Sequence, residues 1–118
     1  MEITKRFRFE AAHRLPNTPP GHKCRRLHGH SYQVAVTVSG AVGEETGWVV
    51  DFSELTKAWQ PLYDILDHNY LNDIAGLENP TSEVLAVWVW GKIKIEGAAL
   101  TAVEISETCT SCCIYRGD

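Results

Sequence analysis

The chain of 118 residues carries 11 basic and 15 acidic side chains, and its net charge of -4 excludes a general electrostatic attraction to nucleic acid or anionic membranes. Its apolar runs are too short to span a bilayer, and its N-terminal residues lack the hydrophobic core of a signal peptide. We therefore expect a single cytoplasmic domain over residues 1–118, with no nucleic-acid or membrane partner.

The four cysteines do not form a disulfide pattern. Cys112 and Cys113 are adjacent, and nothing in the sequence indicates secretion, so we expect four free thiols. Cys109 and Cys112 do form a Cys-x-x-Cys motif. One such motif in a chain without a βαβ pattern is weak evidence for a metal or redox pair.

Two N-terminal segments alternate with period two, which is typical of half-buried strands. In the segment 2–13 the apolar side chains share one parity with His13, and in the segment 28–39 the valines share one parity with His28 and His30. If the two strands pair antiparallel through the intervening loop, the end of the first lies beside the start of the second. His13 then faces His28 and His30.

This arrangement predicts a metal site. Three of the five histidines and one of the four cysteines fall within the nine residues from His22 to His30. Three neutral imidazoles without an obvious fourth ligand are typical of a catalytic zinc site, which keeps one position open for water or substrate. A lone His-x-His is more often a pair of ordinary surface or core residues. The hypothesis therefore depends on the shared parity of His13.

Two helices are expected in the middle of the chain. After a glycine-rich turn at residues 40–47, the segment 51–54 has the acidic residues of a helix start, and Pro61 should kink or shift the helix that follows. A second helix is expected after Pro80, capped by Thr81 or Ser82 and ending by Gly97. Their apolar sides comprise Leu55, Trp59, Leu62 and Leu66 in the first helix and Val84, Leu85, Trp88 and Ile95 in the second.

Strand character returns at residues 100–108, and residues 114–116 suffice for a short last strand. The segment between the helices is expected to be a loop. The element order is β-β-α-α-β-β, which predicts an α+β fold with an antiparallel four-stranded sheet and both helices packed on one face. The edges of such a sheet need covering, and other subunits could cover them.

Three further side chains are candidates for a functional site. Asp67 precedes His68, and a carboxylate can orient an imidazole and raise its basicity, although a solvated helix end would give the same pattern. Glu107 shares a strand face with Val103 and Ile105. It is either a strand-end residue in water or a buried hydrogen-bond acceptor for a ligand.

Six short motifs are distributed along the chain. They are Phe9-Glu-Ala-Ala-His13, Cys24-x-x-x-His28-Gly-His30, Leu66-Asp-His68, Glu78-Asn-Pro-Thr-Ser-Glu83, Glu107-Thr-Cys109 and Tyr115-Arg-Gly117. Together they resemble the tunnelling-fold pterin enzymes of the 6-pyruvoyl-tetrahydropterin synthase family, and the combination is highly specific and spans nearly the whole chain. The short spacing between Cys24 and His28 favours the 6-carboxy-tetrahydropterin synthase branch, which serves queuosine biosynthesis. Cys112 departs from the family pattern, because glycine is expected before Cys113.

The resemblance implies a zinc-dependent lyase that converts 7,8-dihydroneopterin triphosphate to 6-carboxy-5,6,7,8-tetrahydropterin, releasing acetaldehyde and triphosphate. It implies that Zn²⁺ bound by His13, His28 and His30 acidifies the side-chain oxygens of the substrate. It also implies that Cys24 abstracts a carbon-bound proton. The dication and the neighbouring basic residues favour the thiolate form of Cys24.

The resemblance further implies that Asp67 orients His68 as a second catalytic acid–base group. Glu107 would complete the catalytic set and bind the substrate, accepting two hydrogen bonds from the amino-pyrimidine edge of the pterin. The family resemblance implies a homohexamer built from two trimers, with active sites between subunits. The candidates for holding the triphosphate are Lys23, Arg25 and Arg26.

Two alternatives remain open. A 6-pyruvoyl-tetrahydropterin synthase would share the zinc, the thiol and the early proton transfers but would retain the side-chain carbons of the substrate. A noncatalytic zinc-binding module would instead require Cys24 to close the zinc shell as a fourth ligand. His22 lies off the shared parity and is not expected to bind zinc.

Overall fold

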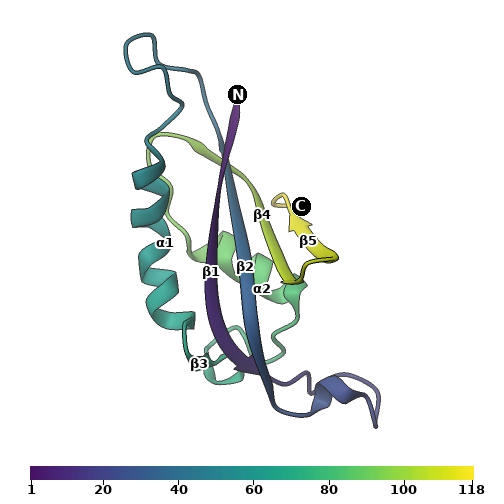
Figure 1. Cartoon of the computed structure of the whole chain (residues 1–118). Coiled ribbons are helices and arrows are strands. Elements are labelled where there is room, and N and C mark those ends of the chain that lie inside the picture. The colour runs from purple at the N-terminus through teal and green to yellow at the C-terminus, as the bar shows by residue number, and fades with distance from the viewer.

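The computed structural model describes all 118 residues and forms a five-stranded sheet in the order β3-β1-β2-β4-β5 with two α-helices. Figure 1 shows β1 and β2 as one long pair, with α1 beside β1 and α2 behind the strands. The strands are β1 (Glu2–His13), β2 (His28–Ser39), β3 (Asn69–Tyr70), β4 (Ala99–Thr108) and β5 (Ser111–Tyr115). The helices are α1 (Phe52–Leu66) and α2 (Ser82–Lys92), with short 3-10 helices η1 (Lys23–Arg25) and η2 (Leu71–Asp73) in the connections.

The α+β class is confirmed, but the antiparallel four-stranded sheet is wrong in two respects. The sheet has five strands, and it is mixed because β3 pairs parallel with β1 at Ala11 and Ala12. Two residues are too few to produce a period-two pattern, so the sequence indicated only a loop there. This short strand matters because it fixes the chain immediately after α1 against the end of β1.

One face of the sheet carries the core. Val34 of β2 stands opposite Phe7 of β1 and Ile105 of β4, so these three side chains share a face. Phe7 stacks on Trp59 of α1 with ring centroids 5.2 Å apart, which places the predicted apolar side of that helix against the sheet. All four predicted α1 side chains are buried. Burial of this stripe stabilises the helix far more than its local propensity does.

The helices differ from expectation in detail. α1 is not interrupted at Pro61, and its N-terminus is capped by Asp51, whose side chain accepts from the Ser53 N–H at 2.9 Å. α2 is capped by Thr81 and ends at Lys92, so Ile95 lies beyond the helix, although it still packs against the core. Neither α-helix is both long and apolar enough to cross a membrane.

The end of β4 is irregular at Ser106 and Glu107. The β4–β5 register pairs Ile105 with Cys113 and Thr108 with Ser111, so two β4 residues oppose the single residue Cys112. This is a β-bulge, which bends a strand and re-aims its side chains. Cys112 has ordinary backbone angles, because the only non-glycine residue with positive φ lies elsewhere. The β5 backbone therefore does not require a glycine at this position.

Candidate metal and acid–base site

The antiparallel register of β1 and β2 brings three histidines together. His13 stands opposite His28, and His30 lies two residues further along β2, opposite Ala11. The His13 Nε2 atom is 3.0 Å from Nε2 of His28 and 3.3 Å from Nε2 of His30. Two nitrogens bound to one zinc ion at tetrahedral angles lie about 3.3 Å apart. The two distances from His13 are close to this value, and the ligand atoms of all three histidines lie within 4.8 Å of one another.

The opposite nitrogen of each ring is bound to the main chain. Nδ1 of His13 lies 2.9 Å from the Pro80 carbonyl oxygen, Nδ1 of His28 lies 2.8 Å from that of Arg26, and Nδ1 of His30 lies 3.0 Å from that of Ser31. A carbonyl oxygen can only accept, so each Nδ1 carries the proton and donates it. Each Nε2 is then left with a lone pair for a metal, which is how metal-binding histidines are oriented in proteins.

Burial gives the cluster a closed side and an open side. The His13 side chain is 1% exposed, and this burial lowers its pKa, which favours the neutral imidazole that binds metals. His28 and His30 are half-buried. Tyr32 packs against the His30 ring with centroids 4.4 Å apart and limits its movement. The three histidines form a group that could hold a metal ion and leaves room for a further ligand.

Cys24 and His22 are not part of this convergent group, whose ligand atoms all lie within 4.8 Å of one another. Cys24 lies in η1 and is half-buried. Its carbonyl accepts from the Leu15 N–H at 2.7 Å, and its own N–H donates to Nδ1 of His22 at 3.1 Å. His22 therefore caps the short helix that presents Cys24. All four cysteines are free thiols, as expected.

Asp67 and His68 form a hydrogen-bonded pair at the end of α1, in which Asp67 is largely buried and the His68 side chain is 78% exposed to solvent. Nδ1 of His68 donates to Oδ2 of Asp67 at 2.7 Å, and Oδ1 of Asp67 accepts from the Glu10 N–H at 2.9 Å. His68 has a φ of 57°, which is uncommon outside glycine and turns its ring back toward the preceding carboxylate. The Glu10 N–H and the His68 imidazole lower the pKa of Asp67, and Asp67 raises the pKa of His68.

Glu107 lies near the end of β4, and its side chain reaches the edge of the histidine cluster. Its Oε2 atom lies 3.8 Å from Nε2 of His30, and its side chain is 29% exposed. The carboxylate also borders a cavity of about 200 Å³ between β4, β5 and the start of α2. Glu107 is thus neither free in water nor fully buried, and it is accessible to a ligand placed between the cavity and the cluster.

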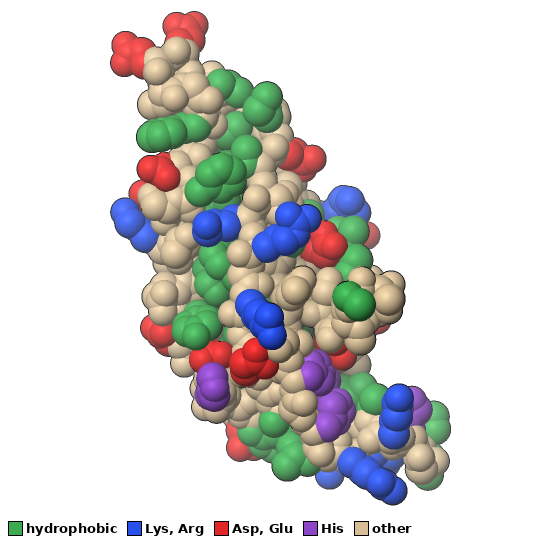
Figure 2. Space-filling view, viewed as in Figure 1, with side chains coloured by type: hydrophobic (Ala, Val, Ile, Leu, Met, Phe, Trp, Pro, Cys, Tyr) green, Lys and Arg blue, Asp and Glu red, His purple; other side chains and the backbone are tan.

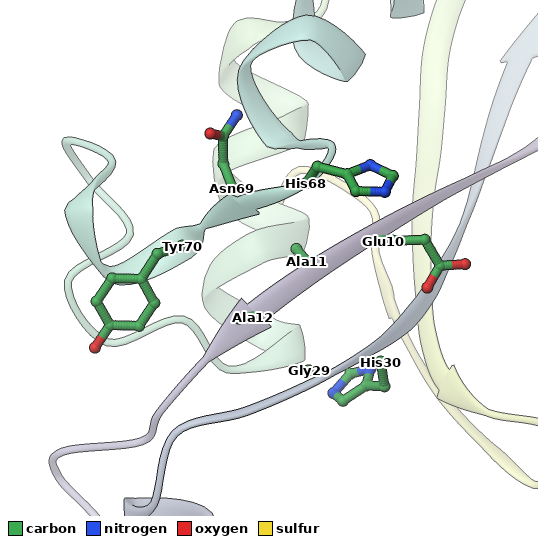
Figure 3. A pocket seen from close by; sticks show the side chains of 8 residues that line it. All are labelled: Glu10, Ala11, Ala12, Gly29, His30, His68, Asn69 and Tyr70. Carbon is green, nitrogen blue, oxygen red and sulfur yellow. The ribbon is translucent and has the colours of Figure 1, made fainter.

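The acid–base pair and the histidine cluster lie apart within one chain. His68, His30 and Glu10 border a shared cavity of about 440 Å³. Figure 3 shows His68 beyond β1 and His30 beyond β2, with the two strands between them. Figure 2 shows histidine side chains gathered toward the end of the molecule where basic side chains also collect. Within one chain, His68 and His30 therefore border this cavity from opposite sides of the β1–β2 pair.

Sequence reasoning missed the parts of the site that the main chain supplies. The Pro80 carbonyl that anchors His13 is 67 residues away from it in the sequence. Glu10 has the parity of the solvent-facing side chains, and only its main chain contacts Asp67. The Pro80 and Glu10 contacts are made by atoms that every residue carries, so no residue type could have signalled them.

The comparisons with known proteins agree with this geometry. The family model described as 6-pyruvoyl tetrahydropterin synthase matches residues 2–118, and the chain belongs to this family of pterin enzymes. A Synechocystis protein named 6-carboxy-5,6,7,8-tetrahydropterin synthase is 50% identical over 96% of this chain and 91% of its own length. A Drosophila melanogaster 6-pyruvoyl tetrahydrobiopterin synthase is 34% identical over 98% of this chain and 79% of its own length. The structure of the Caenorhabditis elegans 6-pyruvoyl tetrahydropterin synthase superposes with a TM-score of 0.90 at 28% identity, covering 100% of this chain and 96% of that one.

Proposed function

We propose that this protein is a zinc-dependent lyase that converts 7,8-dihydroneopterin triphosphate to 6-carboxy-5,6,7,8-tetrahydropterin, releasing acetaldehyde and triphosphate, in the biosynthesis of queuosine. The observation that carries the proposal is the convergence of three Nε2 atoms whose rings are anchored at Nδ1. The 50% identity to the Synechocystis 6-carboxy-5,6,7,8-tetrahydropterin synthase supports the choice of reaction within the family.

The residues present fit zinc, because a set of three neutral imidazoles with one open side suits that ion. His13, His28 and His30 would hold it. Zinc, when bound, supplies a Lewis acid for the side-chain oxygens of the substrate. The zinc-module alternative needs a thiolate in the same shell, and the absence of Cys24 from the convergent group argues against it.

The remaining roles fall to four side chains. Cys24 takes the carbon-bound proton, and its separation from the convergent nitrogens leaves its thiol available as a base. His68 is the second acid–base group, oriented by Asp67 through the 2.7 Å hydrogen bond. Glu107 accepts the two N–H groups of the amino-pyrimidine edge, a planar donor pair that a carboxylate matches.

The active protein is proposed to be a homohexamer of two trimers, with each site completed by a neighbouring subunit. The separation of His68 from the histidine cluster supports this, since a second chain can bring its His68 to the first chain's zinc. β3 covers β1 only at Ala11 and Ala12, which leaves the rest of that edge of β1 without a strand partner within the chain. Unpaired strand edges of this kind favour pairing with another chain.

The substrate triphosphate is proposed to lie along the loop between β1 and β2. Lys23 begins the short helix that carries Cys24, Arg26 follows it, and both side chains are exposed. Arg25 is partly committed, because its guanidinium donates to the Thr18 carbonyl at 2.6 Å. We also place the protein in the cytoplasm, where four unpaired thiols are chemically stable.

Product identification with 7,8-dihydroneopterin triphosphate tests the proposed reaction. The expected products are acetaldehyde and a pterin that carries a carboxyl group at position 6, formed only by protein that contains zinc. A pyruvoyl product with all side-chain carbons retained would instead establish the 6-pyruvoyl-tetrahydropterin synthase reaction, which the 34% identity to the Drosophila enzyme keeps as second candidate. Turnover that persists at full rate after chelation would exclude the zinc-dependent mechanism.

A further inference from the structure

Glu10 connects the acid–base pair to the central strand pair through its main chain. Its N–H donates to Oδ1 of Asp67 at 2.9 Å, and its carbonyl accepts from the His68 N–H at 2.6 Å. Both members of the pair are therefore bound to one residue of β1. β1 pairs with β2 along its whole length. The two hydrogen bonds therefore fix Asp67 and His68 to this long central pair of strands.

The Glu10 side chain is itself held in place. The Ser31 hydroxyl lies 2.7 Å and 2.8 Å from the two carboxylate oxygens and donates to them. The Arg8 guanidinium donates to the Ser31 hydroxyl oxygen at 2.7 Å, and its Nε lies 3.4 Å from the carboxylate. Ser31 stands directly opposite Glu10 in the register. The carboxylate is thus confined by its cross-strand neighbour instead of moving freely in water.

The same carboxylate borders the cavity that contains His68. Glu10 and His68 both line the cavity of about 440 Å³, and Figure 3 shows the His68 ring extending alongside β1 toward the Glu10 side chain. A negative charge held there is close enough to interact with a positive imidazole. The Glu10 side chain is 44% exposed, so this interaction is partly screened by solvent and salt.

We propose that Glu10 is a positioning residue of the acid–base pair: its main chain fixes Asp67 and His68 against β1, and its carboxylate is a second negative charge that stabilises the His68 imidazolium. The proposal rests on the proposed function only where it gives His68 a part in the reaction. The electrostatic statement concerns His68 in the resting protein and can be measured without substrate.

The other charges around His68 set the expected order of effects. Asp67 makes the direct hydrogen bond and contributes most to the raised pKa of His68, and Glu10 contributes a smaller attraction across space. Arg8 is the positive charge beside the Glu10 carboxylate, and its Nε atom lies 3.4 Å from it. The other titratable groups that contact the pair or border its cavity are Tyr63 of α1, His30 of β2 and Tyr70 of β3.

The test is the titration of the His68 imidazole, followed by NMR and assigned by comparison with a His68→Asn variant. In Glu10→Gln the midpoint of the His68 titration should be lower than in the wild type, and this decrease should be smaller than the decrease in Asp67→Asn. Glu2→Gln is the matched control, because it removes the same charge from the same parity of β1 about 27 Å away. It should leave the midpoint unchanged, and added salt should shrink the Glu10 effect.

Kinetics separate positioning from substrate contact. In Glu10→Gln the limb of the pH–rate profile due to His68 should move to lower pH by the NMR shift, with KM unchanged. The proposal would be overturned if the His68 midpoint were unchanged in Glu10→Gln, whether or not KM rises. If Glu10→Gln does not fold, Ser31→Ala releases the carboxylate and should lower the midpoint by a smaller amount; no change there would equally overturn it. A protein without lyase activity would fail the proposed function but would still show these shifts.

Discussion

Replacing His13 or His28 by alanine should remove zinc equally but should not destabilise the protein equally. Each variant loses one of three nitrogen ligands, so each should lose stoichiometric zinc and activity together. The two variants differ in the main-chain carbonyl that loses its hydrogen-bond donor. His13→Ala leaves the carbonyl of a buried Pro80 without its donor, whereas His28→Ala leaves the carbonyl of an exposed Arg26, which water can reach.

The magnitude follows from that difference. A buried acceptor left unpaired costs about 1–3 kcal/mol, while a solvated one costs close to nothing. Zinc-free His13→Ala should therefore unfold at a lower urea concentration than the zinc-free wild type, and zinc-free His28→Ala should unfold close to it. The measurements are zinc content by mass spectrometry and urea unfolding in the presence of a chelator. Equal destabilisation of the two zinc-free variants, or full zinc content in either one, would refute the reasoning.

Three further predictions concern catalysis and assembly. Cys24→Ala should keep its zinc and its fold while turnover falls about 10²–10⁴-fold. His22→Ala should also keep its zinc, because His22 lies outside the convergent group. Loss of zinc on changing Cys24 would make it a ligand. Asp67 raises the pKa of His68, so His68 stays protonated to higher pH in the wild type, and Asp67→Asn should move its limb of the pH–rate profile to lower pH. If the His68 limb of the pH–rate profile does not move in Asp67→Asn, the Asp67–His68 pair has no part in catalysis. Sedimentation at assay concentration should show an oligomer, and an active monomer would contradict sites completed between subunits.

The strand pair and the histidine cluster were predictable because a period-two pattern indicates both which side chains are buried and which face of the strand they share. The parity of His13 along β1 and of His28 and His30 along β2 sufficed to place three side chains on one face, and the register confirms it. The same reasoning placed Glu107 on the face of Val103 and Ile105, and its carboxylate does reach His30. The bulge at Ser106 and Glu107 left no sign in the sequence.

Features that depend on contacts between distant segments were not predictable. β3 exists because Asn69 and Tyr70 meet β1 after α1 ends, and two residues have no periodicity of their own. The left-handed backbone of His68 was likewise not predictable, because a positive φ is uncommon outside glycine even for histidine, which adopts it more often than most residues do. Adjacency of Asp67 and His68 in the sequence therefore suggested a pair without showing that the backbone would allow one.

The anchoring of the three imidazoles by main-chain carbonyls makes the cluster resistant to mutation of its surroundings. Positions 26, 31 and 80 can change residue type and still present a carbonyl oxygen, whereas a carboxylate or amide anchor would disappear with a single substitution. Losing a side-chain anchor typically weakens metal binding about 10–100-fold. Changes of residue type at these three positions should therefore leave the metal affinity largely intact, whereas a shift of the backbone, for example by a deletion ahead of Pro80, should lower it.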